Sequence, residues 1–276
     1  MTSILLVDVA IRDEAHRRLS LLVEKHRSAV RPVYRQSPKR ADLVEAVGTC
    51  TLVRIRDVHL LLTAAHVPEH HKVTSLHVGG SDSLMPVTAR FEVTAPASPQ
   101  GDDPYDFAAC RLSAEQLAAL GDVTFIEDSA LPKGTHFSRG SVFGCLGYPI
   151  SKNKNVDATA QTVSTKLWQY TSYEKAEGIS ASRQDADPDS HLFIQFDEKK
   201  SRDQGGNTVN SIKPQGASGG PVFHLGNLGS GSSYAKDATF APMLAGILTL
   251  NPEHGDAVRA TRINVIIGAL EKTGLL

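Results

Sequence analysis

The sequence predicts an all-β protein built from two antiparallel β units, with a helix at each end of the chain. Short apolar and β-branched segments recur from residue 48 onward and are separated by turn residues, which is typical of antiparallel sandwiches and barrels. A polar connection, Ser113 to Lys133, divides these segments into two sets of similar size. The composition agrees with a globular fold, because 41% of the 276 residues are hydrophobic and 21% are charged.

The first predicted element is an amphipathic helix within an N-terminal extension, residues 1–47. Ile11, Ala15, Leu19 and Leu22 recur at helical spacing among charged residues, and Pro32 ends the pattern. We expect the helix to pack on its own domain. Docking to a regulatory protein is a second interpretation, because amphipathicity does not identify what covers the apolar face.

The predicted strands follow in order along residues 48–276, as a first β unit at about 48–115, a linker at about 116–135 and a second unit at about 136–276. The first set of predicted strands is Thr49 to Ile55, Val58 to Thr63, Val73 to Val78, Pro86 to Val93, Phe107 to Leu112 and, beyond the linker, Ser141 to Leu146. Those of the second set are Thr159 to Tyr170, His191 to Asp197, Gly220 to Leu225 and Met243 to Leu250. A helix closes the chain, because Ile263, Ile266 and Leu270 share one helical face.

Charge and cysteine content exclude several classes of protein. The 29 basic and 30 acidic residues give a formal charge of −1, which argues against a dedicated binder of nucleic acid or anionic membranes. No apolar stretch approaches the roughly 20 residues that span a bilayer, and Met1 to Ala10 lacks the basic start of a signal peptide. Cys50, Cys110 and Cys145 form no C-x-x-C pair, so we expect buried free thiols and a cytoplasmic protein.

The strongest chemical signal is the segment Gln215 to Val222, which reads Gln-Gly-Ala-Ser-Gly-Gly-Pro-Val. Small neighbours leave Ser218 accessible to a substrate carbonyl, and glycine permits the backbone angles of a tight turn. Backbone N–H groups freed by such a turn can bind an oxyanion. On its own the segment is equally consistent with an ordinary turn.

Two further segments supply a candidate base and a candidate acid. An apolar strand ends in Thr63-Ala64-Ala65-His66, where the small alanines leave the imidazole room to face a cleft. Asp106 lies at the entry to another apolar strand, where a carboxylate is costly unless a group such as a histidine donates a hydrogen bond to it. In isolation, a structural histidine and a solvated turn aspartate explain these residues as well.

Together, Thr-Ala-Ala-His and Gly-Ala-Ser-Gly-Gly-Pro resemble the chymotrypsin-like serine peptidases over roughly residues 48–270. The order His66, Asp106, Ser218 is the order of that fold, whereas subtilisins and α/β-hydrolases follow other orders. The resemblance implies two antiparallel six-stranded β-barrels with the active site in the cleft between them. Gly147-Tyr148-Pro149 is also similar to the start of the second barrel in bacterial members.

The resemblance implies a serine endopeptidase that acts on protein or peptide substrates through an acyl-enzyme and needs no metal or organic cofactor. Ser218 would attack the scissile carbonyl, His66 would accept and return the proton, and Asp106 would hold the imidazole. The backbone N–H groups of Gly216 and Ser218 would form the oxyanion hole.

Departures from the secreted members refine the prediction. Ala217 and Val67 replace the aspartate of the zymogen switch and a disulfide cysteine, which favours a bacterial, intracellular type. Ile212 occupies the position of the trypsin pocket aspartate, so we expect an apolar or small side chain at the cleaved residue. The resemblance also assigns Thr249 and Leu250 to the substrate pocket, with the Thr249 hydroxyl supporting the aspartate.

Three rival interpretations stay open. The segment from His66 to His70 spells H-x-x-E-H, a zinc pattern, but Pro68 would break the helix that this pattern requires. Asp102 and Asp103 compete with Asp106 for the role of the acid. The chain is alternatively a peptidase activated by a partner, through the N-terminal helix or the polar segment 199–211, or a catalytically retired binding module with the same fold.

Overall fold

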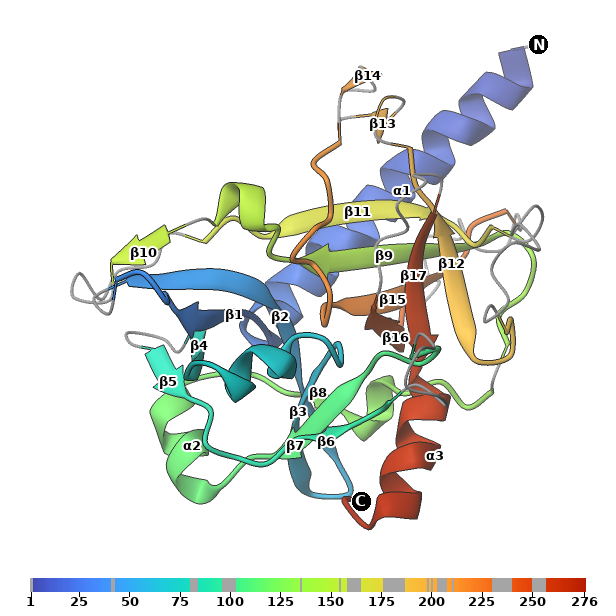
Figure 1. Ribbon diagram of the computed structural model, residues 1–276. Helices are drawn as coiled ribbons and strands as arrows, with labels where there is room; N and C mark the ends of the chain where they lie inside the picture. The colour runs from blue at the N-terminus through green and yellow to red at the C-terminus, as the bar shows by residue number, and fades with distance from the viewer. Residues whose placement is uncertain are drawn as a thin grey trace.

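The computed structural model describes residues 2–40, 43–79, 84–95, 103–134, 136–153, 155–157, 165–175, 187–197, 199, 201–202, 208–209, 211–229, 240–249 and 257–276. Two large, mainly antiparallel sheets lie against each other, with α1 (Thr2–His26) at one end of the chain and α3 (Ile263–Thr273) at the other (Figure 1). The predicted all-β class with a helix at each end is therefore confirmed. Asp102 and Leu250 fall outside the described residues.

The first sheet has the strand order β5-β4-β1-β2-β3-β7-β6. Its strands are β1 (Val30–Gln36), β2 (Leu43–Ile55), β3 (Val58–Thr63), β4 (Leu76–Gly79), β5 (Leu84–Pro86), β6 (Glu92–Val93) and β7 (Ala108–Arg111). Two short strands, β8 (Ile126–Glu127) and β10 (Asn155–Asp157), also pair with β2, β8 in parallel. The sheet thus has nine strands rather than the six expected of a barrel. β8 and β10, which pair along β2, are two of the three additional strands.

The second sheet is a closed, six-stranded antiparallel barrel. Its order is β11 (Trp168–Tyr173), β9 (Ser141–Gly147), β15 (Pro221–Asn227), β16 (Met243–Leu248), β17 (Ala257–Arg262) and β12 (His191–Gln195). A bridge between Glu174 and Ile194, together with a 2.7 Å hydrogen bond from Lys175 N–H to the Phe193 carbonyl, joins the first strand to the last. β13 (Ser201–Arg202) and β14 (Thr208–Val209) pair only with each other. Both lie in the polar segment 199–211, one of the two segments through which a partner would activate the enzyme.

Local sequence explains several of these elements. Arg56 and Asp57 have φ of 49° and 64°, as required at the centre of a two-residue hairpin turn, and they join β2 to β3. In the linker, Ser113 and Gln116 form a reciprocal capping box that begins α2 (Ala114–Leu120). Gly274 ends α3 in the left-handed conformation. Short 3-10 turns lie at Arg27–Ala29, Pro68–Lys72, Asp128–Ala130 and Ile150–Lys152.

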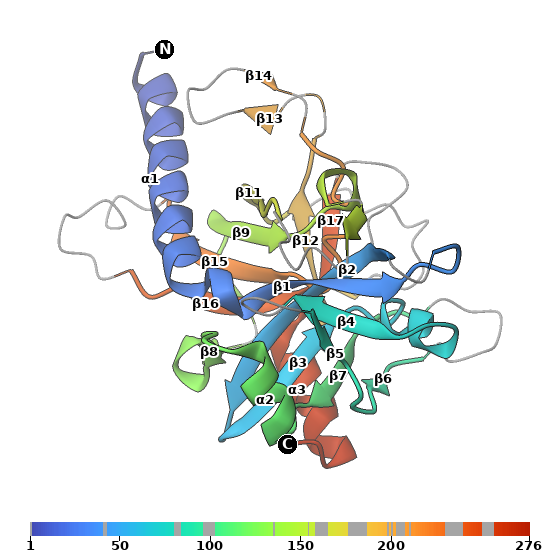
Figure 2. The same cartoon turned by 90° about the vertical axis from the view of Figure 1, so that its left-hand side faces the viewer.

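α1 packs along β9, β11 and β15 of the second sheet before the chain enters the first sheet (Figure 2). Ala15, Leu19 and Leu22 are buried in the main hydrophobic core. Gly144 in β9 admits Leu19, because a Cβ at this glycine would lie 2.7 Å from Leu19 Cδ1. The expectation that the helix packs on its own protein is thereby met along this face. A regulatory partner for the helix stays a prediction.

Leu22→Ala is expected to lower the free energy of unfolding by about 2–5 kcal/mol, because the deleted methyl groups leave a cavity in the core. Leu22 is 1% exposed, whereas its neighbour Leu21 is 46% exposed. Leu21→Ala is therefore the matched control and should change stability by less than about 0.5 kcal/mol. Urea denaturation measures both variants, and equal effects would contradict this packing.

The two longest strands that were not predicted from the sequence are β1 and β17. β1 lies within the predicted N-terminal extension, so the sheet region begins earlier in the chain than residue 48, and the helix ends at His26 rather than near residue 30. β17 occupies residues for which the sequence analysis predicted no strand, and α3 begins directly after it at Ile263. β1 contains Pro32 and β17 contains two arginines, so neither segment has the composition of a typical strand.

The core and surface agree with the composition. All three cysteines are buried and free, and burial raises the pKa of the Cys110 and Cys145 thiols to about 12.

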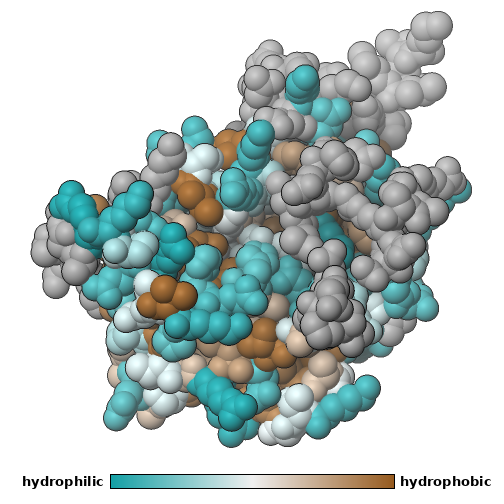
Figure 3. Space-filling view, in the orientation of Figure 1, coloured by the Kyte–Doolittle hydropathy of each residue, from teal (hydrophilic) through white to brown (hydrophobic). Residues whose placement is uncertain are grey.

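On the face in Figure 3, hydrophobic residues form separate patches among hydrophilic ones. Within the described ranges, no helix combines the length and the hydrophobicity needed to cross a bilayer.

Candidate active site

His66 and Asp106 form the centre of the site. His66 follows β3 through the buried residues Ala64 and Ala65, and its Nδ1 lies 3.1 Å from both carboxylate oxygens of Asp106. The backbone N–H of His66 donates to Asp106 Oδ1 at 3.2 Å, and the N–H of Ala65 donates to the Asp106 carbonyl at 3.1 Å. The structure thus brings together the base and the acid proposed from the sequence.

This pairing alters the proton affinity of the imidazole. Burial alone would lower the pKa of His66, but the hydrogen bond and negative charge of Asp106, with a smaller contribution from Glu69, raise it above its ordinary value of 6.5. Asp106 is only 5% exposed, so its carboxylate is shielded from solvent. The arrangement holds a proton on Nδ1 and leaves Nε2 to accept another.

Asp106 is positioned by both halves of the molecule. Its φ of 45° lies in the left-handed region, which aspartate adopts more readily than most residues. Two residues of the second sheet contact the backbone just before Asp106. The Thr261 hydroxyl donates to the Tyr105 carbonyl, and His191 Nε2 lies 2.6 Å from the Pro104 carbonyl. Contacts between the sheets therefore fix the acid against the histidine.

Ser218 sits on a turn that β2 holds in place. Thr49 N–H donates to the Ser218 carbonyl and Thr49 Oγ1 to the Gly216 carbonyl, both at 2.8 Å. Thr51 Oγ1 donates to the Gly219 carbonyl at 2.8 Å. Both threonines are fully buried. The first sheet thus anchors the serine turn of the second, on the same side as His66.

The Ser218 hydroxyl does not bond to His66 in this structure. Its Oγ donates to the Thr249 carbonyl at 2.7 Å, and no hydrogen bond joins Ser218 to His66 among the described residues. A rotation about the Cα–Cβ bond is the movement that would release the hydroxyl from Thr249. The structure therefore shows His66 bonded to Asp106, and it shows Ser218 bonded to Thr249.

The N–H groups of Gly216 and Ser218 lie opposite two carbonyls that accept hydrogen bonds within the protein. Because a trans peptide places C=O and N–H on opposite sides, each N–H opposes the preceding carbonyl. The Gln215 carbonyl accepts from Ile150 N–H at 2.9 Å, and the Ala217 carbonyl accepts from Gly220 N–H at 2.9 Å. Within the described structure the N–H groups of Gly216 and Ser218 have no protein acceptor, which suits an oxyanion.

The predicted substrate-pocket residues are only partly brought together. A small cavity of about 10 Å³ beside the serine is lined by Pro214, Ala217, Ser218, Leu248, Thr249, Val258 and Arg259. Ile212 is not one of these lining residues, but it packs against the core cluster that contains Ala217, Leu248 and Val258. An apolar preference stays a prediction. The predicted role of the Thr249 hydroxyl needs correction, because it bonds to Arg259 rather than to Asp106.

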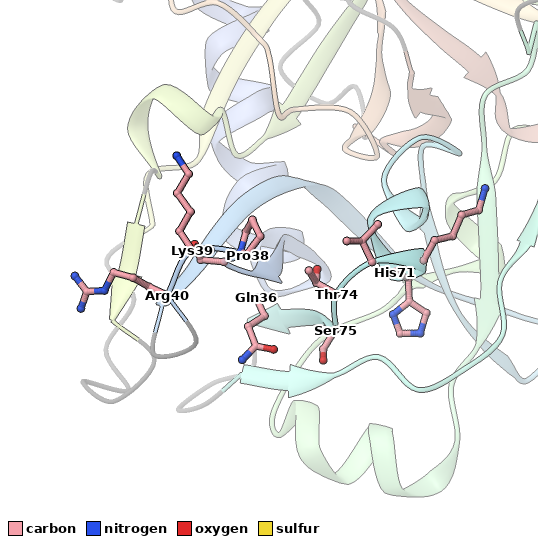
Figure 4. Close-up of a pocket in the computed structure, with 10 residues that line it drawn as sticks. Gln36, Pro38, Lys39, Arg40, His71, Thr74 and Ser75 are labelled. Carbon is pink, nitrogen blue, oxygen red and sulfur yellow. Dashed lines mark hydrogen bonds between the residues drawn. The ribbon is translucent and has the colours of Figure 1, made fainter.

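A larger groove of about 730 Å³ lies between the β1–β2 turn and the segment that follows His66 (Figure 4). It is lined by residues 36–40 and 71–75. Lys39 and Arg40 stand at one end and His71 at the other. Lys72 is also part of the lining, and no lining residue is acidic. The charge of this groove suits anionic groups.

The two histidines of the zinc pattern face different partners. His66 Nδ1 faces Asp106, whereas His70 Nδ1 lies 3.1 Å from Arg35 Nη1. Pro68 begins a 3-10 helix rather than lying within an α-helix. Among the described residues, no three histidine, cysteine or acidic side chains are grouped to hold a metal ion.

Several contributing residues were not found from the sequence. Thr49 and Thr51 alternate within an apolar strand, and this pair of buried hydroxyls was an available signal. His191 and Arg259 carried no signal, because only the pairing of β12 with β17 brings them to the site.

No family model matches the chain, and no curated protein matches it. Among solved structures, the HtrA-type protease AlgW with a tripeptide and a variant of it are similar, each with 15% identity and a TM-score of 0.49. The match covers 92% of this chain and 62% of each protease chain, so this chain spans less than two thirds of their length. Likeness at this level carries no argument about the reaction.

Proposed function

We propose that the protein is a serine endopeptidase that uses His66, Asp106 and Ser218. The observation that carries the proposal is the bond from His66 Nδ1 to the buried carboxylate of Asp106. Ser218 lies on a glycine turn that Thr49 of the first sheet holds in place. A carboxylate, an imidazole and a serine hydroxyl in this order are the components of base-activated acyl transfer.

The proposed reaction proceeds in two steps. Ser218 Oγ bonds to the substrate carbonyl carbon while its proton passes to His66 Nε2, and the N–H groups of Gly216 and Ser218 bind the oxyanion. His66 then gives the proton to the amine as the C–N bond breaks. Water, activated by the same imidazole, hydrolyses the acyl-enzyme and restores Ser218.

A second candidate is a peptidase that a partner or ligand must activate. The bond from Ser218 Oγ to the Thr249 carbonyl favours it, because the hydroxyl must leave this acceptor before it can reach an imidazole. Catalytic hydrogen bonds are often formed only when substrate binds, so the bond to Thr249 is also compatible with constitutive activity.

The proposal predicts a covalent adduct with a fluorophosphonate probe, located on Ser218 by mass mapping. Ser218→Ala should abolish the adduct and His66→Ala should slow its formation strongly, because the hydroxyl loses its base. Folding of each variant is checked by circular dichroism. A folded protein that labels only in native lysate would support activation by a partner, and labelling that is independent of Ser218 would refute the proposal.

The pH profile of labelling is a further prediction. Labelling requires neutral His66, and Asp106 raises the pKa of this imidazole. The rate should therefore rise with pH through a midpoint above 6.5, the ordinary imidazole value. Stopped-time labelling between about pH 5 and pH 9 measures the midpoint. A midpoint below the ordinary value would show that Asp106 does not act on His66 as the structure indicates.

A further inference from the structure

We propose that Arg259 selects substrates with aspartate or glutamate at the residue whose carbonyl Ser218 attacks. The inference rests on the proposed peptidase function, because it assigns a substrate class to the same site. The expectation of an apolar side chain at the cleaved residue depended on Ile212, which does not line the cavity beside the serine. Arg259 does line this cavity.

Arg259 is connected to the nucleophile through one residue. Its Nε lies 3.3 Å from Thr249 Oγ1, and its carbonyl accepts from Thr249 N–H at 3.0 Å. The Thr249 carbonyl in turn accepts from Ser218 Oγ at 2.7 Å. The register of β17 opposite β12 pairs Arg259 with Phe193 and so fixes the position of the arginine backbone.

The cavity lined by Arg259 is also lined by Ser218, the proposed nucleophile. The side chain of an acylating residue projects beside the carbonyl that Ser218 attacks, and Ser218 itself lines this cavity. Pro214, Ala217, Leu248 and Val258 supply apolar walls, and Arg259 is the charged residue of the lining. A guanidinium stays protonated and can bind a carboxylate through two parallel hydrogen bonds, which apolar walls strengthen.

The volume of about 10 Å³ implies that the cavity opens when substrate enters. Two movements would open it: release of Ser218 Oγ from the Thr249 carbonyl, which catalysis requires, and displacement of the half-buried arginine side chain. A carboxylate repays that displacement by pairing with the guanidinium, whereas a leucine does not and a lysine is repelled.

The groove in Figure 4 independently favours acidic peptides. His66 gives its proton to the leaving amine, so the leaving portion of a peptide lies on the His66 side of the serine. The segment that begins at Pro68, directly beyond His66, leads into this groove. Its cations are Lys39, Arg40 and Lys72, of which Lys72 also lies 3.9 Å from Glu69. These cations would attract carboxylates that follow the cleaved bond.

The test uses aryl phosphonate probes that carry a glutamate, glutamine, leucine or lysine side chain at the position next to phosphorus. Glutamate and glutamine have the same shape, so their rate ratio isolates the charge. For the full chain we expect the glutamate probe to label Ser218 roughly 10- to 100-fold faster than the glutamine probe. In Arg259→Gln the ratio of the two rates should fall to about one, because glutamine offers the probe no positive charge.

Arg54→Gln is the matched control, because it also removes one cation, at an exposed position where Arg54 pairs with Glu127. It should keep the preference for glutamate. Equal rates for the glutamate and glutamine probes, in a chain that the fluorophosphonate labels, would overturn the inference and leave the peptidase proposal standing. Absence of fluorophosphonate labelling in every condition would instead refute the peptidase proposal, and the inference with it.

Discussion

Asp106→Asn is expected to lower the rate constant for fluorophosphonate labelling by about 10⁴ while the fold is retained, as the corresponding change does to kcat in Ser-His-Asp peptidases. His66 Nδ1 lies 3.1 Å from both oxygens of this carboxylate. An asparagine amide can donate to Nδ1 and so favours the tautomer with a proton on Nε2, which cannot accept the serine proton. The substitution also removes the charge that raises the pKa of His66, so the pH midpoint of the residual labelling should fall.

Asp103→Asn provides the matched control. Asp103 lies in the same loop, but its carboxylate accepts from the Thr94 hydroxyl and from the Tyr105 N–H rather than from His66. We expect its labelling rate to stay within about threefold of the parent, since the imidazole keeps its partner. A large loss in Asp103→Asn together with normal labelling in Asp106→Asn would show that the acid has been assigned to the wrong residue.

Gly219→Ala is expected to lower the free energy of unfolding by about 3 kcal/mol or more and to abolish labelling. Gly219 has φ of 91°, and a Cβ there would lie 1.9 Å from the Thr49 carbonyl oxygen and 2.4 Å from Thr63 Oγ1. Relief of this overlap must move either the turn or β2, and the turn carries Ser218. Thermal unfolding and probe labelling measure the two effects.

The same substitution at Gly268 is the control for Gly219→Ala. Gly268 lies within α3, and nothing lies within 4 Å of a Cβ built on it. Alanine favours a helix over glycine by about 1 kcal/mol, so Gly268→Ala should stabilise the protein and leave labelling intact. Near-normal stability and labelling of Gly219→Ala would mean that the turn is not packed against β2 as described.

Local patterns were sufficient for much of the architecture. Hydrophobic periodicity predicted α3 and the buried face of α1, and recurring apolar and β-branched segments separated by turn residues predicted β2 and β3. These features depend on neighbouring residues. The Gly-Ala-Ser-Gly-Gly segment predicted a tight turn, since glycine is required where φ is positive, as at Gly216 and Gly219.

Other elements could not be predicted from local patterns. β1 and β17 contain residues that favour other structures and are strands because their partners pair with them. The order of the strands in each sheet depends on hydrogen bonds between segments that are far apart in the chain. The residues of one segment do not indicate which distant segment it pairs with.

For the candidate site, the sequence by itself determined which side chains were available: a histidine after small residues, an aspartate at a strand entry and a serine among glycines. Only the tertiary structure decided that His66 bonds to Asp106, that Ser218 rests on the Thr249 carbonyl, and that Arg259 lines the adjacent cavity. The physical reason is that these contacts join residues far apart in the chain. Their geometry is set by the packing of one sheet on the other, through threonines such as Thr49 and Thr51.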